Sequence, residues 1–124
     1  MTLRRLAVLQ WVGLILGAWV WGAQHVLGWG ITEAACNSGH TAAGINHDLW
    51  QAILTAAAAV LVVGGEAAAI AVIRATRDSS YESAPPVGRL RFAAIAALAA
   101  NVIFLVIILL DGLAAIFNVA CRQA

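Results

Sequence analysis

Residues 49–73 read LWQAILTAAAAVLVVGGEAAAIAVI and contain a single charged side chain, Glu66. About 20 apolar residues span the hydrocarbon core of a bilayer as an α-helix, and this run exceeds that length. Two further apolar runs cover about residues 6–28 and 92–119. The sequence therefore predicts an all-α membrane protein, a single membrane domain over residues 1–124 with three transmembrane helices.

The composition of the chain agrees with this class. The 124 residues are 63% hydrophobic and 10% charged, and the mean hydropathy is +0.91. These values lie outside the range of soluble globular domains, so we expect the lipid bilayer to be a partner of the protein and to contact most of its surface. The formal net charge is +1, and no basic stripe with interleaved aromatic residues is present. We therefore expect no nucleic-acid partner.

The distribution of arginine predicts the orientation of the chain. All basic residues are arginine, and six of them lie at two places, Arg4 and Arg5 before the first run and four in the connection 74–91. The connection 29–48 contains none. By the positive-inside rule the N-terminus and loop 74–91 are cytoplasmic, while loop 29–48 and the C-terminus lie outside. We expect a multi-pass protein of a bacterial inner membrane.

Two cysteines fall on the same predicted side. Cys36 lies in the outer loop and Cys121 just after the third run. The outer side of a bacterial inner membrane is oxidising, so a Cys36–Cys121 disulfide is the natural interpretation. Two unrelated free thiols are the alternative.

Two polar residues lie deep inside the predicted spans. Counted at 1.5 Å per residue from Arg74 and Arg91, Glu66 and Asn101 both lie about 12–15 Å inside the cytoplasmic edge. A protonated Glu66 hydrogen-bonded to Asn101 would satisfy both groups and clamp two helices together. The alternatives are a proton-carrying carboxyl group and a contact between Glu66 and a polar group on a larger partner.

A second polar group is predicted at the outer boundary. His25 and Asp111 each lie about 30 Å from the cytoplasmic edge, so we expect a hydrogen bond or ion pair between them. Gln24 is adjacent, and His47 opens the second span. The third histidine, His40, lies in the same outer loop, so all three histidines fall on the outer side.

Histidine and cysteine on one side raise the question of a metal. Both side chains bind copper or zinc, and imidazoles from different helices also bind haem iron. The sequence has no CxxC, HxxxH or HExxH spacing, so we expect no metal or cofactor. The alternative is a small haem b or copper protein that uses His25 and His47.

Small residues predict the packing faces. Gly13 and Gly17 form a GxxxG element, and Gly64 with Gly65 precedes Glu66. Small side chains allow helices to approach closely, so we expect these glycines to pack against helices of this chain or of a larger integral membrane complex. The sequence shows no phosphate-binding glycine loop, nucleophile elbow or catalytic carboxylate pair, so we expect no enzyme activity.

The order of several short motifs is similar to that of a known group of proteins. The motifs are Trp21-Gly22-Ala23-Gln24-His25, Cys36, His47, Arg89-Leu90-Arg91-Phe92 and a terminal Cys121. In this arrangement the chain resembles small three-span membrane proteins that are encoded beside the subunits of bacterial haem-copper cytochrome oxidases. The resemblance implies a non-catalytic accessory subunit or assembly factor of a terminal oxidase in the respiratory, electron-transport chain.

Overall fold

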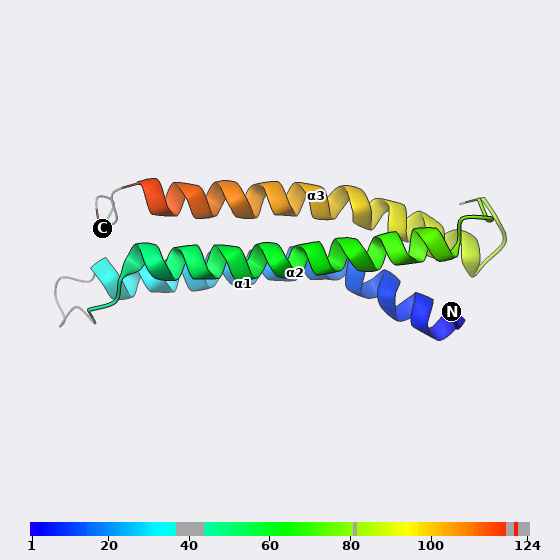
Figure 1. Cartoon of the computed structure of the whole chain (residues 1–124), viewed down its shortest axis with the longest axis horizontal. Helices are drawn as coiled ribbons and strands as arrows, with labels where there is room; N and C mark the ends of the chain where they lie inside the picture. The colour runs from blue at the N-terminus through cyan, green and yellow to red at the C-terminus, as the bar shows by residue number, and fades with distance from the viewer. Residues whose placement is uncertain (37–43, 81, 119–120, 122–124) are drawn as a thin grey trace.

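Three long helices make up the structure, a computed structural model that describes residues 1–36, 44–80, 82–118 and 121. They are α1 (Leu3–Cys36), α2 (His47–Ala75) and α3 (Val87–Phe117), and the described residues contain no strand (Figure 1). Each helix is long and apolar enough to cross a membrane. The predicted all-α, three-span architecture is confirmed.

The helices are longer than the apolar runs that predicted them. Residues 29–36, predicted as loop, continue α1 to Cys36, and α3 begins at Val87 and not at 92. A hydropathy run marks the part of a helix that lies in hydrocarbon, whereas a helix can continue into the headgroup region with polar residues such as Thr32. At the start of α2, Asn46 accepts a hydrogen bond from the backbone N–H of Leu49 at 3.1 Å and caps the helix. The predicted end of the third span at 119 lies outside the described residues.

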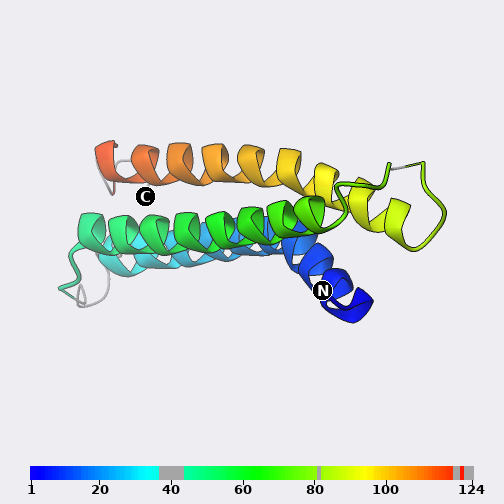
Figure 2. The ribbon, with the colours of Figure 1, turned by 45° about the vertical axis from the view of Figure 1, so that its right-hand side comes forward.

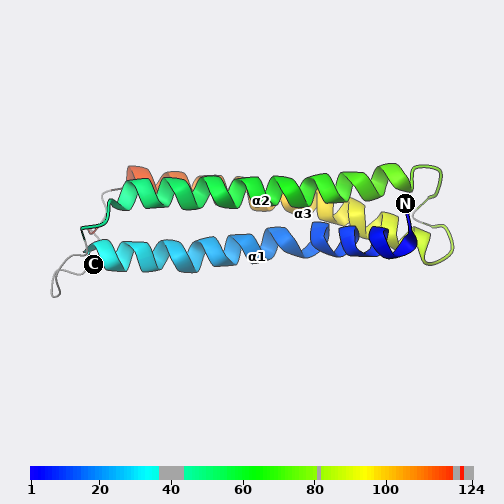
Figure 3. The same ribbon diagram turned by 60° about the horizontal axis from the view of Figure 1, so that its bottom comes forward.

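The helices form an elongated antiparallel bundle in which each contacts the other two. One end carries the N-terminus and the connection from α2 to α3, and the other carries the connection from α1 to α2 and the chain after α3 (Figures 1 and 3). We call the first end the arginine end, because Arg4, Arg5, Arg74, Arg77, Arg89 and Arg91 lie there. The second end is called the disulfide end.

Two apolar clusters fill the bundle. The first, toward the arginine end, contains Leu6, Val72, Leu90 and Ala94, and the second contains Val20, Ala58, Val62 and Ile108. Lipid tails are as apolar as these side chains, so burial alone does not hold helices together in a membrane. Close fit does, and the small residues Ala69, Ala94 and Ala97 are fully buried between the helices.

The outward faces are apolar. Large hydrophobic side chains are exposed along all three helices, among them Trp19 at 73%, Val60 at 71% and Phe117 at 81%. Such continuous exposure is foreign to a monomeric soluble protein and suits contact with a lipid bilayer.

Candidate functional site

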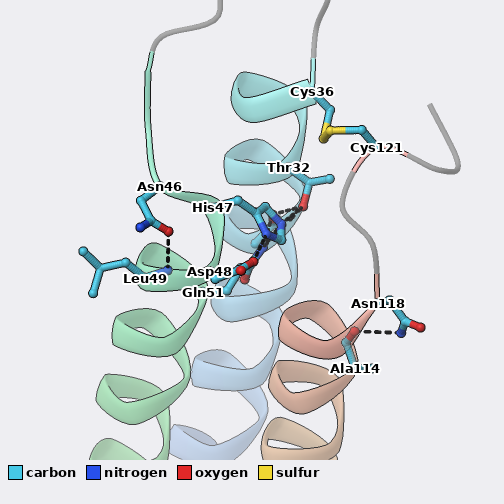
Figure 4. A network of polar contacts seen from close by, with 11 residues as sticks. Thr32, Cys36, Asn46, His47, Asp48, Leu49, Gln51, Ala114, Asn118 and Cys121 are labelled. Carbon is cyan, nitrogen blue, oxygen red and sulfur yellow. Dashed lines mark hydrogen bonds and ion pairs between the residues drawn. A yellow bond between two sulfur atoms is a disulfide. The ribbon is translucent and has the colours of Figure 1, made fainter.

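A disulfide closes one end of the bundle. Cys36 is the last residue of α1, and it is bonded to Cys121, 85 residues later, with the two Cα atoms 5.1 Å apart (Figure 4). The bond ties the end of α1 to the chain that follows α3. The predicted pairing is confirmed, and the alternative of two free thiols is not what the structure shows.

Below the disulfide, a polar network joins the last turns of α1 to the first turn of α2 (Figure 4). His47 has its Nδ1 3.0 Å from Asp48 Oδ1 and its Nε2 3.1 Å from Thr32 Oγ1. Gln51 donates from Nε2 to the carbonyl of Gly28 at 2.9 Å. The imidazole is largely covered, with 9% of the His47 side chain exposed. The sequence singled out His47, but it missed Thr32 and Gln51.

The chemistry of these groups fixes part of the proton arrangement. A carboxylate only accepts hydrogen bonds, so Nδ1 of His47 carries a hydrogen and donates to Asp48. The hydroxyl of Thr32 has a second acceptor, the carbonyl of Gly28 at 3.1 Å.

His25 and Asp111 meet at the α1–α3 surface. His25 Nδ1 lies 3.4 Å from Asp111 Oδ2, and the side chains are 65% and 41% exposed. Exposed ion pairs contribute little to stability, so this pair does not hold the bundle together by itself. The ring of Trp21 lies 6.2 Å from that of His25 and 6.1 Å from that of Phe104, which extends the contact along α1 and α3.

Gln24 is adjacent to His25 in sequence but points into the bundle. It is 4% exposed, and its Nε2 donates to the carbonyl of Ile108 at 3.2 Å and to Thr55 Oγ1 at 3.4 Å. Thr55 in turn donates to the carbonyl of Gln51 at 2.8 Å. The three helices therefore meet in one buried polar layer. A lone hydroxyl beside the alanine run of α2 was the signal for Thr55, and sequence reasoning passed it over.

The predicted clamp between Glu66 and Asn101 is wrong. Asn101 is 1% exposed and donates from Nδ2 to the carbonyl of Gly13 on α1 at 2.8 Å. The Glu66 side chain is half-buried, and its buried Oε2 has no hydrogen-bond partner among the described residues. Both residues lie at the level of Gly65, as the count along the helices predicts. The amide of Asn101 is rotated toward α1, which a count along the axis does not reveal.

Three of the four predicted glycines lie where helices touch. A Cβ atom on Gly13 would sit 3.2 Å from the backbone N of Ala69, and one on Gly17 would sit 2.5 Å from Asn101 Oδ1. Gly65 faces Leu16 and Asn101 at 3.5 Å. Nothing lies within 4 Å of such a Cβ atom on Gly64. The prediction that Gly64 packs against another helix of this chain is therefore wrong.

The structure does not bring His25 and His47 together as ligands. His47 contacts Thr32, which follows His25 by seven residues on α1 and therefore lies about 10 Å farther along the helix axis. Within the described ranges, no three His, Cys, Asp or Glu side chains are grouped closely enough to hold a metal ion. His40 lies outside those ranges.

Arg91 has a structural role that the charge pattern did not indicate. It donates from Nη1 to the carbonyl of Thr76 at 2.7 Å and to that of Ile73 at 3.3 Å. These carbonyls lie at the C-terminal end of α2, where helix carbonyls lack partners within the helix and a cation is favourable. Arg91 thus fastens α3 to the end of α2.

The described side chains form hydrogen bonds between helices at four depths. Three buried side-chain oxygens among them have no hydrogen-bond partner, Gln24 Oε1, Asn101 Oδ1 and Glu66 Oε2, and Glu66 is the one carboxyl group of the three. Neither a family model, nor a curated protein, nor a solved structure matches the chain.

Proposed function

We propose that this protein is a non-catalytic accessory subunit or assembly factor that docks onto a larger integral membrane complex. The observation that carries the proposal is Glu66. Its side chain is half-buried, its Oε2 is buried, and the carboxyl group makes no hydrogen bond to the described residues. A carboxyl group at membrane depth is costly unless a donor satisfies it, and a donor from a neighbouring protein would pair with the part of the carboxyl group that is not buried.

The position of Glu66 on its helix indicates where such a partner would lie. Glu66 follows Thr55 by eleven residues, which is about three helical turns, so both lie on one side of α2. That side is turned toward α3, because the Thr55 side chain lies against Gly112 of α3. A partner helix seated along the α2–α3 edge would reach the exposed part of the Glu66 carboxyl group.

Gly64 supports contact on a second face. Since Gly13, Gly17 and Gly65 are occupied by contacts within the bundle, they do not contribute to an outer surface. Gly64 is exposed. Two small residues lie on the same face of α2, the exposed Ala57 seven residues before Gly64 and the half-buried Ala71 seven residues after it. Small residues in such a row allow another helix to approach.

We further propose that the complex is a bacterial respiratory assembly, with a haem-copper terminal oxidase as the first candidate. The support is the resemblance in motif order together with the charge pattern. Under this proposal the arginine end is cytoplasmic and the disulfide end faces the oxidising side of the inner membrane.

A proton-carrying role for Glu66 is the rival proposal. It would require a polar path from Glu66 toward the Gln24–Thr55 layer. The apolar cluster of Val20, Ala58, Val62 and Ile108 lies between these two levels, with Val62 and Ile108 at 1% and 0% exposure. Such a layer offers no donor or acceptor side chain, so the structure favours docking over conduction through the bundle.

Purification of the tagged protein in mild detergent tests the docking proposal. Wild type should copurify with a larger membrane complex in constant ratio, and Glu66→Gln should retain the partner because an amide still offers a donor and an acceptor. Glu66→Leu should lose most of it. Glu82→Gln, which neutralises an exposed carboxyl group in the connection from α2 to α3, is the matched control and should behave as wild type.

Gly64→Leu separates docking from folding. The bundle has space for a side chain at this position, so the variant should keep wild-type helicity and thermal stability while it weakens copurification. Recovery of wild type alone, in every mild detergent and from native membranes, would refute the docking proposal. Retention of the partner by Glu66→Leu with loss of proton uptake by the complex would favour the rival.

A further inference from the structure

We propose that the N-terminal part of α1 holds an anionic phospholipid, with its phosphate bound by Arg4 and Arg5. The site is a hollow at the arginine end, lined by Met1, Thr2, Arg4, Arg5, Val8 and Leu9. Its volume of about 680 Å³ lies within the range of small-molecule sites. This inference does not depend on the identity of the docking partner.

The two arginines are free to bind an anion. Both are exposed, and within the described part of the chain no carboxylate lies within 4.0 Å of either guanidinium group. Arg77 pairs with Asp78 at 3.7 Å and Arg91 with the end of α2, whereas Arg74 and Arg89 are exposed but do not line the hollow. Guanidinium groups match phosphate oxygens in geometry and charge, so Arg4 and Arg5 are the phosphate ligands of this hollow.

The charge at this end selects an anionic ligand. Six arginines lie here, and the nearby connection between α2 and α3 adds two carboxylates, Asp78 and Glu82. The excess of positive charge therefore favours a ligand with net negative charge over a zwitterionic lipid.

The apolar part of the hollow identifies the anion as a lipid. Val8 and Met1 are 57% and 70% exposed, and they line the same hollow as the two arginines. Leu9 joins the hollow to the bundle, because it also packs against the cluster of Leu6, Val72, Leu90 and Ala94. A ligand that fits both surfaces has a phosphate at one end and an acyl chain at the other, whereas a free phosphate ion leaves the apolar residues uncovered.

The hollow lies on the outward side of the first turns of α1. These turns, dark blue in Figures 1 and 2, bend relative to the rest of the helix, and Leu6 packs against Val72 and Leu90 while Val8 is exposed. The apolar run of α1 begins at Leu6, so Arg4 and Arg5 lie at the level where phospholipid phosphates are found. An acyl chain beside Val8 would then point toward the hydrocarbon.

Native mass spectrometry of the full chain from mixed phosphatidylglycerol and phosphatidylcholine micelles tests the site. Wild type should retain phosphatidylglycerol in preference to phosphatidylcholine. The double variant Arg4→Gln with Arg5→Gln should reduce that preference about 30-fold, since each basic residue near an anionic membrane surface contributes about fivefold. Arg4→Lys with Arg5→Lys, which keeps the charge pattern and hence insertion, should give an intermediate preference because bidentate contacts are lost.

The control removes equal charge elsewhere at the same end. Arg74→Gln with Arg89→Gln should leave the preference within twofold of wild type, and an equal loss in this variant would overturn the proposal in favour of diffuse attraction. Soluble glycerol phosphate added in excess should not displace the lipid. Displacement by glycerol phosphate would show that the acyl chain contributes nothing, and would overturn the assignment to a lipid.

Discussion

The two halves of the bundle are held together in different ways. The disulfide half, from the Gln24–Thr55 layer to the disulfide, is joined by side-chain hydrogen bonds between helices and by one covalent bond. The arginine half relies on small, closely fitted residues, with Asn101 and Arg91 each donating to a backbone carbonyl. Because lipid competes for apolar surface, fit and hydrogen bonds decide the association of helices. Directional hydrogen bonds therefore set the register of the helices in the disulfide half, whereas close approach of small residues sets it in the arginine half.

Removal of the disulfide should have the largest effect and should fall on one half. Cys36→Ser with Cys121→Ser should lower the free energy of unfolding by about 2 kcal/mol, toward the lower end of typical values because the inserted helices already restrict the unfolded chain. Reversible unfolding in detergent measures the change, and wild type treated with a reductant is the control. Hydrogen exchange should increase at the end of α3 and stay unchanged around Leu6 and Val72. An unchanged free energy of unfolding would contradict the account.

Added methyl groups should distinguish the two kinds of packing. A Cβ atom on Gly112 would collide with the side chain of Thr55, which is held by its bond to the carbonyl of Gln51, so Gly112→Ala should cost about 1.5 kcal/mol. Gly17→Ala overlaps less with its neighbours, of which Asn101 Oδ1 at 2.5 Å and Phe104 Cδ2 at 3.0 Å are the nearest, and should cost about 1 kcal/mol.

The matched control for both substitutions is Gly22→Ala, where nothing lies within 4 Å of the added atom. It should be neutral or slightly stabilising, because alanine favours the helix. The same unfolding measurement ranks all three variants. A greater cost at Gly17 than at Gly112 would contradict the inference that the hydrogen-bonded Thr55 leaves less room for an added methyl group than the surroundings of Gly17 do.

Loss of single hydrogen bonds should give the smallest effects. Gln51→Met keeps the length of the side chain and removes the bond to Gly28, so a loss of about 1 kcal/mol is expected. Arg91→Met removes the bond to Thr76 at the end of the bundle, where water can take its place, and should cost about 0.5 kcal/mol. Equal effects from the two variants would remove the proposed difference in hydrogen bonding between the halves.

Much of this fold follows from the sequence, since hydropathy reports which segments cross the membrane. The same pattern, combined with the arginine distribution, placed Cys36 and Cys121 on one side, and they are bonded. Helix ends were less predictable, because residues 29–36 are polar enough to resemble a loop and still continue α1.

The candidate site shows why the rest could not be predicted. Counting residues gives the depth of a side chain but not the direction in which it points around the helix. His25 and Asp111 share a depth and face each other, whereas Glu66 and Asn101 share a depth and do not. Gln24 and His25 are neighbours in sequence, yet one is buried and the other exposed.

α1 is longer than a bilayer is thick. Its 34 residues span about 51 Å, whereas the hydrocarbon core of a bilayer is about 30 Å thick and the headgroups bring the total to about 45 Å. The sulfur bridge at the tip of this helix therefore stands in water on one face of the membrane, within reach of a phosphine that cannot cross lipid. In sealed vesicles of known membrane orientation, cleavage of the disulfide by the external phosphine shows on which side of the membrane Cys36 and Cys121 lie. The disulfide thus serves as a chemical marker for the orientation of the protein.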